Sequence, residues 1–268
     1  MILTFITPFL LFIIGLALGS FATMASHRIP RKEGLVVERS HCPHCNHALG
    51  VKDLFPLFSW LLQRGKCRYC KKPISRRYPV IELVTGSCFM ILYFTHGVTL
   101  HALPLYILTV SLMILAVIDL EHMIIPDGLQ IFHLLLTIIL FIWGWLNSME
   151  ALLGAAIAAA IALFLHYIYG WLRKKEMLGL GDVKFIPICG ALVGLHSVVF
   201  FFLLAGFSGT ILGLFVRAYK GTCHYPFGPA LALSLWMCLV FDAGNWLGHF
   251  EIWLETILLG PVHSFVRI

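Results

Sequence analysis

The sequence predicts an all-α polytopic membrane protein with about eight transmembrane helices and one small polar insertion after the first helix. Three observations support this fold class: 60% of the 268 residues are hydrophobic and only 12% are charged, long apolar runs recur, and one polar segment interrupts them. A soluble domain of this length needs more charge to cover its surface. A helix of about 20 apolar residues crosses a bilayer, so most of the chain belongs in lipid.

Seven apolar runs have roughly the length of a membrane span, and a shorter one brings the expected number to eight. The N-terminal run has no basic residues ahead of its apolar stretch, so we expect a retained anchor and not a cleaved signal peptide. Residues 249–268 should form an amphipathic or re-entrant tail. The seven runs cover residues 3–24, 79–95, 103–120, 129–146, 151–172, 198–217 and 229–248, and the shorter one covers 184–196.

The basic residues predict the orientation. Twelve of the 19 Lys and Arg residues lie between Arg28 and Arg77, and short loops rich in such residues stay in the cytoplasm. Eight crossings return the other basic clusters to the same side, provided that residues 184–217 cross twice. Because these residues flank spans without interleaved aromatic residues, the expected partner is the lipid bilayer and not nucleic acid. The clusters returned are Arg173, Lys174, Lys175, Lys184, Arg217 and Lys220.

The polar segment contains two CxxC pairs, and we expect three parts in the chain: the first transmembrane helix (1–26), a four-cysteine domain (27–78) and a membrane domain (79–268). Four thiolates within tetrahedral reach are what a closed structural zinc site requires. About 50 residues with few large apolar side chains need such a metal to fold. The insertion is therefore predicted to be a cytoplasmic zinc-ribbon-like domain. Its ligands are Cys42, Cys45, Cys67 and Cys70.

Other interpretations of the cysteines are weaker. Disulfides rarely persist in the reducing compartment that the basic residues indicate, and a thioredoxin-like pair lacks a surrounding βαβ pattern. Nearby histidines could replace one thiolate, although four cysteines already fill the shell. Outside the pairs, lone cysteines are expected to be packing residues. The histidines are His41, His44 and His47, and the lone cysteines are Cys88, Cys189, Cys223 and Cys238.

Two aspartates at the ends of apolar runs are the candidate catalytic residues. Asp119 nearly ends one run, Asp182 follows Gly179 and Gly181, and the predicted topology puts both at the same depth on the cytoplasmic side. Two adjacent carboxyl groups can share one proton, so that one activates water and the other polarises a peptide carbonyl. The glycines would let an extended substrate come close. Alternatively, Asp182 is only the N-cap of a helix.

Other acidic residues have more ordinary interpretations. Asp127 belongs to a Pro-Asp-Gly turn, Glu121 is expected at a solvated interface position, and Glu82 could pair with a basic neighbour. Glu176 precedes the glycines and could bound their pocket.

Taken in order, five segments resemble the type IV prepilin peptidases, which are GxGD-type aspartyl peptidases, over about residues 15–232. Thr23 stands where that family usually has asparagine. The first segment contains Gly19-Ser20-Phe21 and Arg28-Ile29-Pro30, and the second is the four-cysteine domain followed by Tyr78-Pro79-Val80-Ile81-Glu82. The remaining ones are Ile118-Asp119-Leu120-Glu121 with Ile125-Pro126-Asp127, Gly179-Leu180-Gly181-Asp182-Val183-Lys184, and Pro226-Phe227-Gly228-Pro229.

The resemblance implies an enzyme of the bacterial inner membrane whose zinc domain and active site face the cytoplasm. Such enzymes cleave the basic leader from prepilins or pseudopilins, and many then methylate the new N-terminal residue with S-adenosylmethionine. The four-cysteine domain favours both activities. No soluble-type glycine-rich motif for the methyl donor is visible, so no residue is assigned to methyl transfer.

Two other classes of protein compete with this interpretation. A transporter would place its acids near mid-bilayer and would show internal repeats, and neither is found in the sequence. A membrane-anchored zinc scaffold without chemistry would make Asp119 and Asp182 incidental. Replacing each aspartate by asparagine separates the scaffold from the peptidase.

Overall fold

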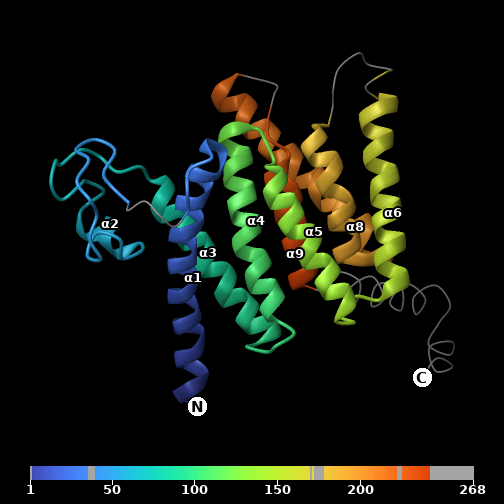
Figure 1. The fold of residues 1–268 in the computed structure, drawn as a ribbon, viewed down its shortest axis with the longest axis horizontal. Coiled ribbons are helices and arrows are strands. Elements are labelled where there is room, and N and C mark those ends of the chain that lie inside the picture. The colour runs from blue at the N-terminus through green and yellow to red at the C-terminus, as the bar shows by residue number, and fades with distance from the viewer. Residues whose placement is uncertain (1, 36–39, 170, 172–177, 222–224, 242–268) are drawn as a thin grey trace. The chain divides into compact units, whose positions relative to one another are not determined.

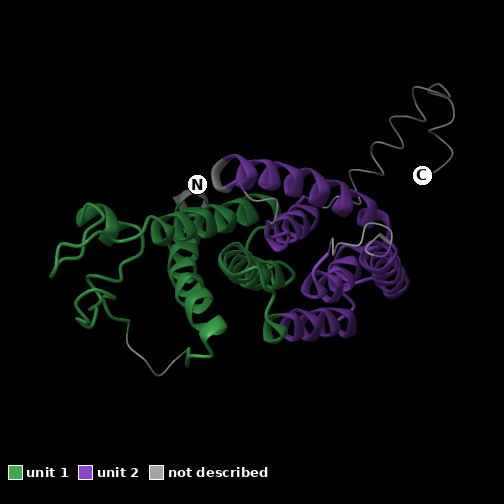
Figure 2. Ribbon diagram, turned by 90° about the horizontal axis from the view of Figure 1, so that it is seen from above, with its two compact units in different colours: residues 1–129 green, residues 130–268 purple. Residues whose placement is uncertain are grey.

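The structure of the chain is a computed structural model, and it describes residues 2–35, 40–169, 171, 178–221 and 225–241. Within these residues the secondary structure is helical apart from two isolated antiparallel bridges. The chain divides into two compact units, residues 1–129 and residues 130–268, which are coloured separately in Figure 2. The predicted tail 249–268, Glu176 and Cys223 lie outside the described residues.

The first unit contains a helical hairpin region and the cysteine-containing segment (Figure 1). Its helices are α1 (Ile2–Arg28), α2 (Phe58–Leu62), α3 (Arg77–His96) and α4 (Leu103–His122), and a short 3₁₀ turn covers Ile29–Arg31. Helix α1 packs against α3 and α4. A Cβ atom built on Gly15 would lie 2.7 Å from the Cα atom of Gly86. Such glycines let two apolar helices approach closely, which stabilises helix pairs in lipid.

The second unit contains most of α5 (Asp127–Ile142), then α6 (Ser148–Leu163), α8 (Leu180–Lys220) and α9 (Gly228–Val240). A π-helical turn, Phe164–Tyr169, continues α6. The Asn147 side chain caps the start of α6, because its Oδ1 accepts the backbone N–H of Met149 at 3.1 Å. Helix α5 packs on α8 through the buried rings of His133 and Phe185, whose centroids are 5.3 Å apart.

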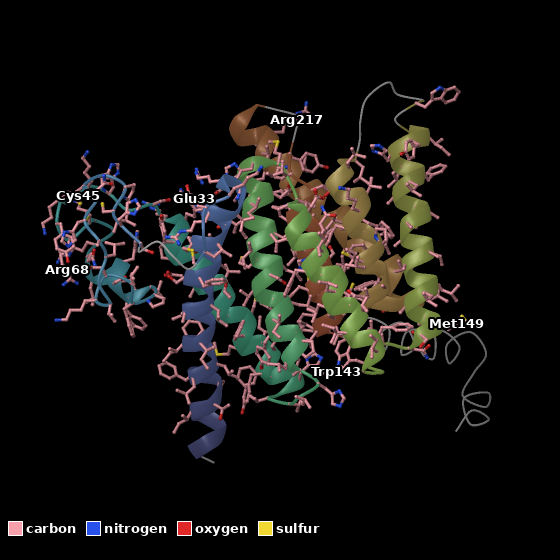
Figure 3. The ribbon with its side chains drawn as sticks, viewed as in Figure 1. Glu33, Cys45, Arg68, Trp143, Met149 and Arg217 are labelled. Carbon is pink, nitrogen blue, oxygen red and sulfur yellow. The ribbon has the colours of Figure 1, made fainter. Side chains whose placement is uncertain are left out.

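Helix α8 is two helices joined at Gly194, whose φ of 75° and ψ of 174° are not helical. Unbroken, its 41 residues would extend about 60 Å, about twice the hydrocarbon thickness of a bilayer. The first half runs antiparallel to α6, since Leu178 contacts His166 at one end and Gly194 faces Glu150 at the other. The second half returns, because Arg217 lies at the end of the unit opposite Met149 (Figure 3). The expected division of residues 184–217 into two segments is confirmed, and a crossing of the membrane by each segment stays a prediction.

Among the described residues, five helices are long and apolar enough to cross a membrane, namely α1, α3, α4, α6 with its π turn, and α8. Two shorter apolar helices are α5 and α9. With α8 counted as two segments, they correspond to the eight apolar runs of the sequence. Large exposed side chains form a stripe along the second half of α8, at Leu203, Phe207, Ile211 and Leu214, as on a lipid-facing helix. The chain is a multi-pass membrane protein. The three-part domain organisation stays a prediction.

Candidate active site and metal centre

The four cysteines of the insertion come together in the first unit. Their Sγ atoms all lie within 4.8 Å of one another, and those of Cys42 and Cys70 are 3.9 Å apart. A tetrahedral zinc ion with zinc–sulfur bonds of about 2.3 Å places its sulfur ligands about 3.8 Å apart. The side chains therefore fit a metal ion with four thiolate ligands, and the predicted ligand set is brought together by the fold.

The two CxxC pairs sit in loops with the same backbone geometry. The N–H of the first cysteine donates to the carbonyl five residues later in both loops, from Cys42 to His47 at 3.0 Å and from Cys67 to Lys72 at 2.8 Å. In both loops the residue after the second cysteine has a positive φ, 53° at Asn46 and 59° at Lys71. In the first loop the backbone N–H of His44 faces the Cys42 sulfur and that of His47 faces the Cys45 sulfur. The four ligands are thus positioned by two copies of one local structure.

The thiols of the first CxxC pair have opposite pKa shifts. The backbone N–H of His44 lowers the pKa of the Cys42 thiol to about 6. The backbone N–H of His47 lowers the pKa of Cys45, but burial and hydrogen bonds with Cys42 and Cys70 raise it to about 11. A bound cation would favour the thiolate form, which is the form that binds metal. Tyr69 stacks on the ring of His47 with centroids 3.6 Å apart. Its hydroxyl also donates to Oδ2 of Asp53 at 3.2 Å. Asp53 pairs with Nε of Arg68 at 3.0 Å, so a polar network links the two loops on one side of the cluster.

Asp119 lies in the last turn of α4 and is buried, with 5% of its surface exposed. Its backbone carbonyl accepts the N–H of Met123 at 2.8 Å, and Met123 ends the helix in the left-handed conformation with a φ of 54°. This cap stops α4 directly after the acid, and α5 begins at Asp127. The sequence prediction that Asp119 stands at a helix end is confirmed.

Asp182 lies in the first turn of α8, where Gly179 is the N-cap residue with extended backbone angles. The alternative that Asp182 is the N-cap is therefore wrong by three positions. A Cβ atom built on Gly179 would lie 3.3 Å from Oδ2 of Asp182, so the missing side chain leaves room for the carboxylate to fold back over the helix start. Gly181 lies between them on the first turn and is half-buried.

The loop before Asp182 is held by a residue that the sequence did not reveal. A ring nitrogen of His166, Nδ1, lies 2.9 Å from the carbonyl oxygen of Leu178 in a hydrogen bond. His166 belongs to the π-helical turn after α6, and single π turns are frequent at functional sites. Leu178 is buried and immediately precedes Gly179. His166 is therefore a support for the segment Gly179–Asp182, and only the irregular helix end could have signalled it.

The end of α4 is tied to α3 by an ion pair. Nε of Arg77 lies 2.8 Å from Oε1 of Glu121, and the Arg77 guanidinium also donates to the hydroxyl of Ser26 at 2.6 Å. Glu121 was expected at a solvated interface position, and its side chain is 35% exposed. It also joins the last turn of α4 to the first turn of α3, and through Ser26 to α1.

Glu82 anchors the cysteine-containing segment to α3. Its Oε2 accepts the backbone N–H of Leu57 at 2.7 Å, and Glu82 is buried with 5% exposed. The expected basic neighbour is thus replaced by a backbone donor. Leu57 has a φ of 59°, a conformation that costs a residue with a side chain about 1 kcal/mol or more. The hydrogen bond offsets this cost and fixes the start of α2.

Known proteins match both the four-cysteine and the aspartate regions. Residues 13–96 match the bacterial peptidase A24 N-terminal domain, and residues 106–214 match the type IV leader peptidase family. A prepilin leader peptidase/N-methyltransferase of Stutzerimonas stutzeri is 32% identical over 257 residues, covering 85% of this chain and 89% of the relative. The chain belongs to the type IV leader peptidase family.

Further relatives of this type IV leader peptidase are similar over most of their length. The prepilin leader peptidase/N-methyltransferase of Aeromonas hydrophila is 33% identical, covering 87% of this chain and 90% of the relative. The type 4 prepilin-like proteins leader peptide-processing enzyme of Escherichia coli O78:H11 is 33% identical, covering 85% and 91%. No solved structure matches the chain. The first family match contains all four cluster cysteines, and the second contains Asp119 and Asp182.

Proposed function

We propose that this chain is an aspartic endopeptidase of the bacterial inner membrane that removes the basic leader from type IV prepilins or pseudopilins and methylates the new N-terminal amine. The observation that carries the proposal is the match to relatives whose names state both activities, over most of both chains. The membrane helices and the two acids at helix ends are what such a reaction needs.

Asp119 and Asp182 are proposed as the catalytic dyad. In this mechanism the two carboxyl groups share one proton. The ionised carboxylate takes a proton from water, whose oxygen attacks the peptide carbonyl carbon, while the protonated carboxyl group donates a hydrogen bond to the carbonyl oxygen. The tetrahedral intermediate then collapses, the C–N bond breaks, and the amine leaves with a proton from the dyad. The apparent pKa values of such a dyad belong to the pair.

The helix termini suit a substrate that is half in lipid. The apolar helix of a prepilin would stay among the membrane helices, and its polar leader would reach the acids in water, so that no charge crosses the bilayer. Gly179 leaves space beside the Asp182 carboxylate. With Gly181, it would allow the extended segment of the substrate to pass close to the enzyme backbone.

The cluster of Cys42, Cys45, Cys67 and Cys70 is proposed to bind one structural zinc ion. Four thiolates complete a tetrahedral shell and leave no position for substrate. S-adenosylmethionine is proposed as the methyl donor, because the relatives named N-methyltransferase require a donor of this kind. The proposed orientation, with the zinc domain and the dyad on the cytoplasmic side, is supported by the basic residues between Arg28 and Arg77.

Coexpression with a prepilin substrate tests the dyad. Asp119→Asn and Asp182→Asn keep the side-chain shape but remove the ionisable group, and each should abolish leader removal to below about 1% of the wild-type rate, since the two acids act as a unit. Asp127→Asn is the matched control, because Asp127 is exposed at the start of α5, and it should cleave within about twofold of wild type.

Mass spectrometry of the purified pilin reports cleavage and N-methylation together. Normal leader removal by either Asp119→Asn or Asp182→Asn would exclude the dyad and favour a scaffold without chemistry. Cleaved but unmethylated pilin from the wild type would restrict the function to proteolysis.

A further inference from the structure

Large apolar side chains are exposed around the short helix α2 of the four-cysteine segment. Phe58, Leu61 and Leu62 follow the i, i+3, i+4 spacing of one helix face, and their exposed fractions are 42%, 54% and 84%. Phe55, just before the helix, is 52% exposed, and its ring contacts that of Phe58 with centroids 5.6 Å apart. These four residues are called the α2 apolar patch below.

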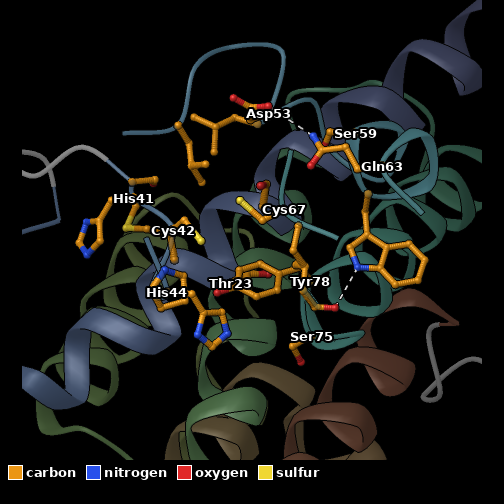
Figure 4. Close-up of a pocket in the computed structure, with 18 of the residues that line it drawn as sticks. Thr23, His41, Cys42, His44, Asp53, Ser59, Gln63, Cys67, Ser75 and Tyr78 are labelled. Atoms are coloured by element: carbon orange, nitrogen blue, oxygen red, sulfur yellow. Dashed lines mark hydrogen bonds between the residues drawn. The ribbon is translucent and has the colours of Figure 1, made fainter. Parts of the chain in front are cut away.

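The other side of α2 is packed against the cysteine-containing segment. The indole N–H of Trp60 donates to the carbonyl of Ile74 at 3.3 Å. Nε2 of Gln63, the residue after the helix, donates to Oδ1 of Asp53 at 3.3 Å (Figure 4). Trp60 and Gln63 also line a cavity of about 450 Å³ beside Tyr78. The polar contacts of α2 therefore lie on its inner side, and the described part of the chain leaves the apolar patch uncovered.

Helix α2 is held beside the first turns of the membrane helix α3. The N–H of Leu57, the residue before α2, donates to Oε2 of Glu82 at 2.7 Å. Glu82 is the sixth residue of α3, about 7.5 Å along the helix axis from its first residue. The whole helix is about 30 Å long, which is the thickness of the hydrocarbon layer. Apolar residues of α3 are exposed near this level too, at Val80, Leu83 and Val84, so the patch adds to an exposed apolar surface.

Basic residues border the patch. Lys52 and Arg64 lie on either side of it in the sequence, and both are exposed and take part in no ion pair among the described residues. Residues 40–76 contain seven Lys or Arg residues and a single carboxylate, Asp53, which pairs with Arg68. Apolar side chains with a basic border are typical of segments that lie in the interface of an anionic bilayer.

We propose that the α2 apolar patch lies in the membrane interface, with its side chains at the ends of the acyl chains and with Lys52 and Arg64 on anionic phospholipid headgroups. Interfacial helices bury their apolar side about 5–10 Å into the boundary between headgroups and acyl chains. The position of Glu82, about 7.5 Å from the start of α3, matches this depth. The contact holds the four-cysteine segment against the membrane surface.

A protein partner explains fewer of these observations. A second copy of the chain or the apolar helix of a prepilin would cover the patch but would supply no negative charge for Lys52 and Arg64. An anionic lipid surface supplies both, and the hydrogen bond from Leu57 to Glu82 already holds the patch beside a membrane helix. The inference goes beyond the proposed reaction and does not depend on it, so its failure would leave the proposed function standing.

Photo-crosslinking to lipid tests the inference. The full-length protein is reconstituted as single copies, without prepilin, into nanodiscs of phosphatidylethanolamine and phosphatidylglycerol. A phospholipid with a diazirine near the glycerol end of its acyl chain is the probe. After illumination, peptide mapping should find lipid adducts in residues 51–64 as well as in α1 and α3. Labelled α1 and α3 without adducts in residues 51–64 would overturn the inference, and this is the result expected if a second copy or a prepilin covers the patch.

A charged variant of the patch sharpens the test. The double variant Leu61→Glu and Leu62→Glu should reduce the adducts in residues 51–64 at least about fivefold, because carboxylates oppose burial in an anionic interface. Ala48→Glu is the matched control, since Ala48 is exposed in the first cysteine loop outside the patch, and it should be labelled within about twofold of wild type. Equal adduct yields from the double variant and the wild type would overturn the inference.

A second double variant tests the basic border without placing charge in the patch. Lys52→Gln with Arg64→Gln should lower the adducts in residues 51–64 about threefold or more in the anionic nanodiscs. In nanodiscs of phosphatidylcholine it should match the wild type, because no anionic headgroup is present there. Wild-type adduct yields from this variant in both lipids would refute the headgroup contacts. Trypsin protection of both variants in detergent, equal to that of the wild type, shows that the segment stays folded.

Discussion

Nε of Arg77 lies 2.8 Å from Oε1 of Glu121, which joins the first turn of α3 to the last turn of α4 two residues beyond Asp119. The same guanidinium donates to Ser26 on α1. Three membrane helices are therefore connected at the end where the candidate catalytic acid lies. We expect the position of the Asp119 side chain to depend on this connection, with Arg77 and Glu121 in a positioning role.

Glu121→Gln should reduce leader cleavage about two- to fivefold, mainly through kcat, because a partly exposed ion pair contributes about 1 kcal/mol or less. Cleavage kinetics with a purified prepilin would measure this. Arg76→Gln is the control, since Arg76 is exposed and has no ion pair in the described part of the chain. An increase in KM without a change in kcat for Glu121→Gln would contradict a positioning role.

Glu82→Ala should destabilise the cysteine-containing segment by about 1–3 kcal/mol, because the partly buried N–H of Leu57 loses its charged acceptor. Glu82→Gln keeps an oxygen acceptor and should lose less. Limited trypsin digestion would follow the change, since the segment contains many Lys and Arg residues. Equal protection of the alanine variant and the wild type would show that the hydrogen bond does not hold the segment.

Gly179→Ala should lower kcat about tenfold or more, because the added Cβ atom would lie 3.3 Å from Oδ2 of Asp182 and would shift the carboxylate. Gly128→Ala offers a matched control in the first turn of α5, where a Cβ atom meets nothing within 4 Å. Both variants add one methyl group at a helix start, but only the one at Gly179 lies next to a carboxylate. Comparable activities would show that the space at Gly179 is not needed.

Gly190→Ala should destabilise the second unit by about 1–3 kcal/mol, since its Cβ atom would overlap the carbonyl oxygen of Gly154 where α6 and α8 cross. Gly206→Ala should not destabilise it, because Gly206 lies in the second half of α8 and an added Cβ atom there meets nothing within 4 Å. Thermal unfolding in detergent, followed by helical circular dichroism, distinguishes them. A melting temperature for Gly190→Ala equal to that of Gly206→Ala would mean that the crossing can widen freely.

Cys42→Ser and Cys67→Ser should each remove the metal, because three thiolates and one hydroxyl bind zinc far more weakly than four thiolates. Cys88→Ser is the control, since Cys88 lies on α3 outside the cluster. Elemental analysis of purified protein should give about one zinc per chain for the wild type and the control. Full zinc in both ligand variants would refute the site.

Much of this protein followed from local patterns. Apolar runs predicted the apolar helices, including the division of α8 into two segments at Gly194, because each residue's transfer to lipid depends on its own side chain. The spacing of Cys42, Cys45, Cys67 and Cys70 predicted the ligand cluster, because two short loops of one type position all four sulfur atoms. Asp119 was placed correctly at a helix end for the same reason, since the run and its cap are local.

Contacts between distant segments were decided only by the tertiary structure. Three features depend on how the helices pack: the hydrogen bond from Leu57 to Glu82, the ion pair of Arg77 with Glu121, and the cavity beside Tyr78. The sequence pattern of one helix does not show which other helix it contacts. The start of α8 shows the same division. The sequence marked Gly179 and Asp182 as important, but the choice of Gly179 as N-cap depends on hydrogen bonds such as that from Val183 to its carbonyl.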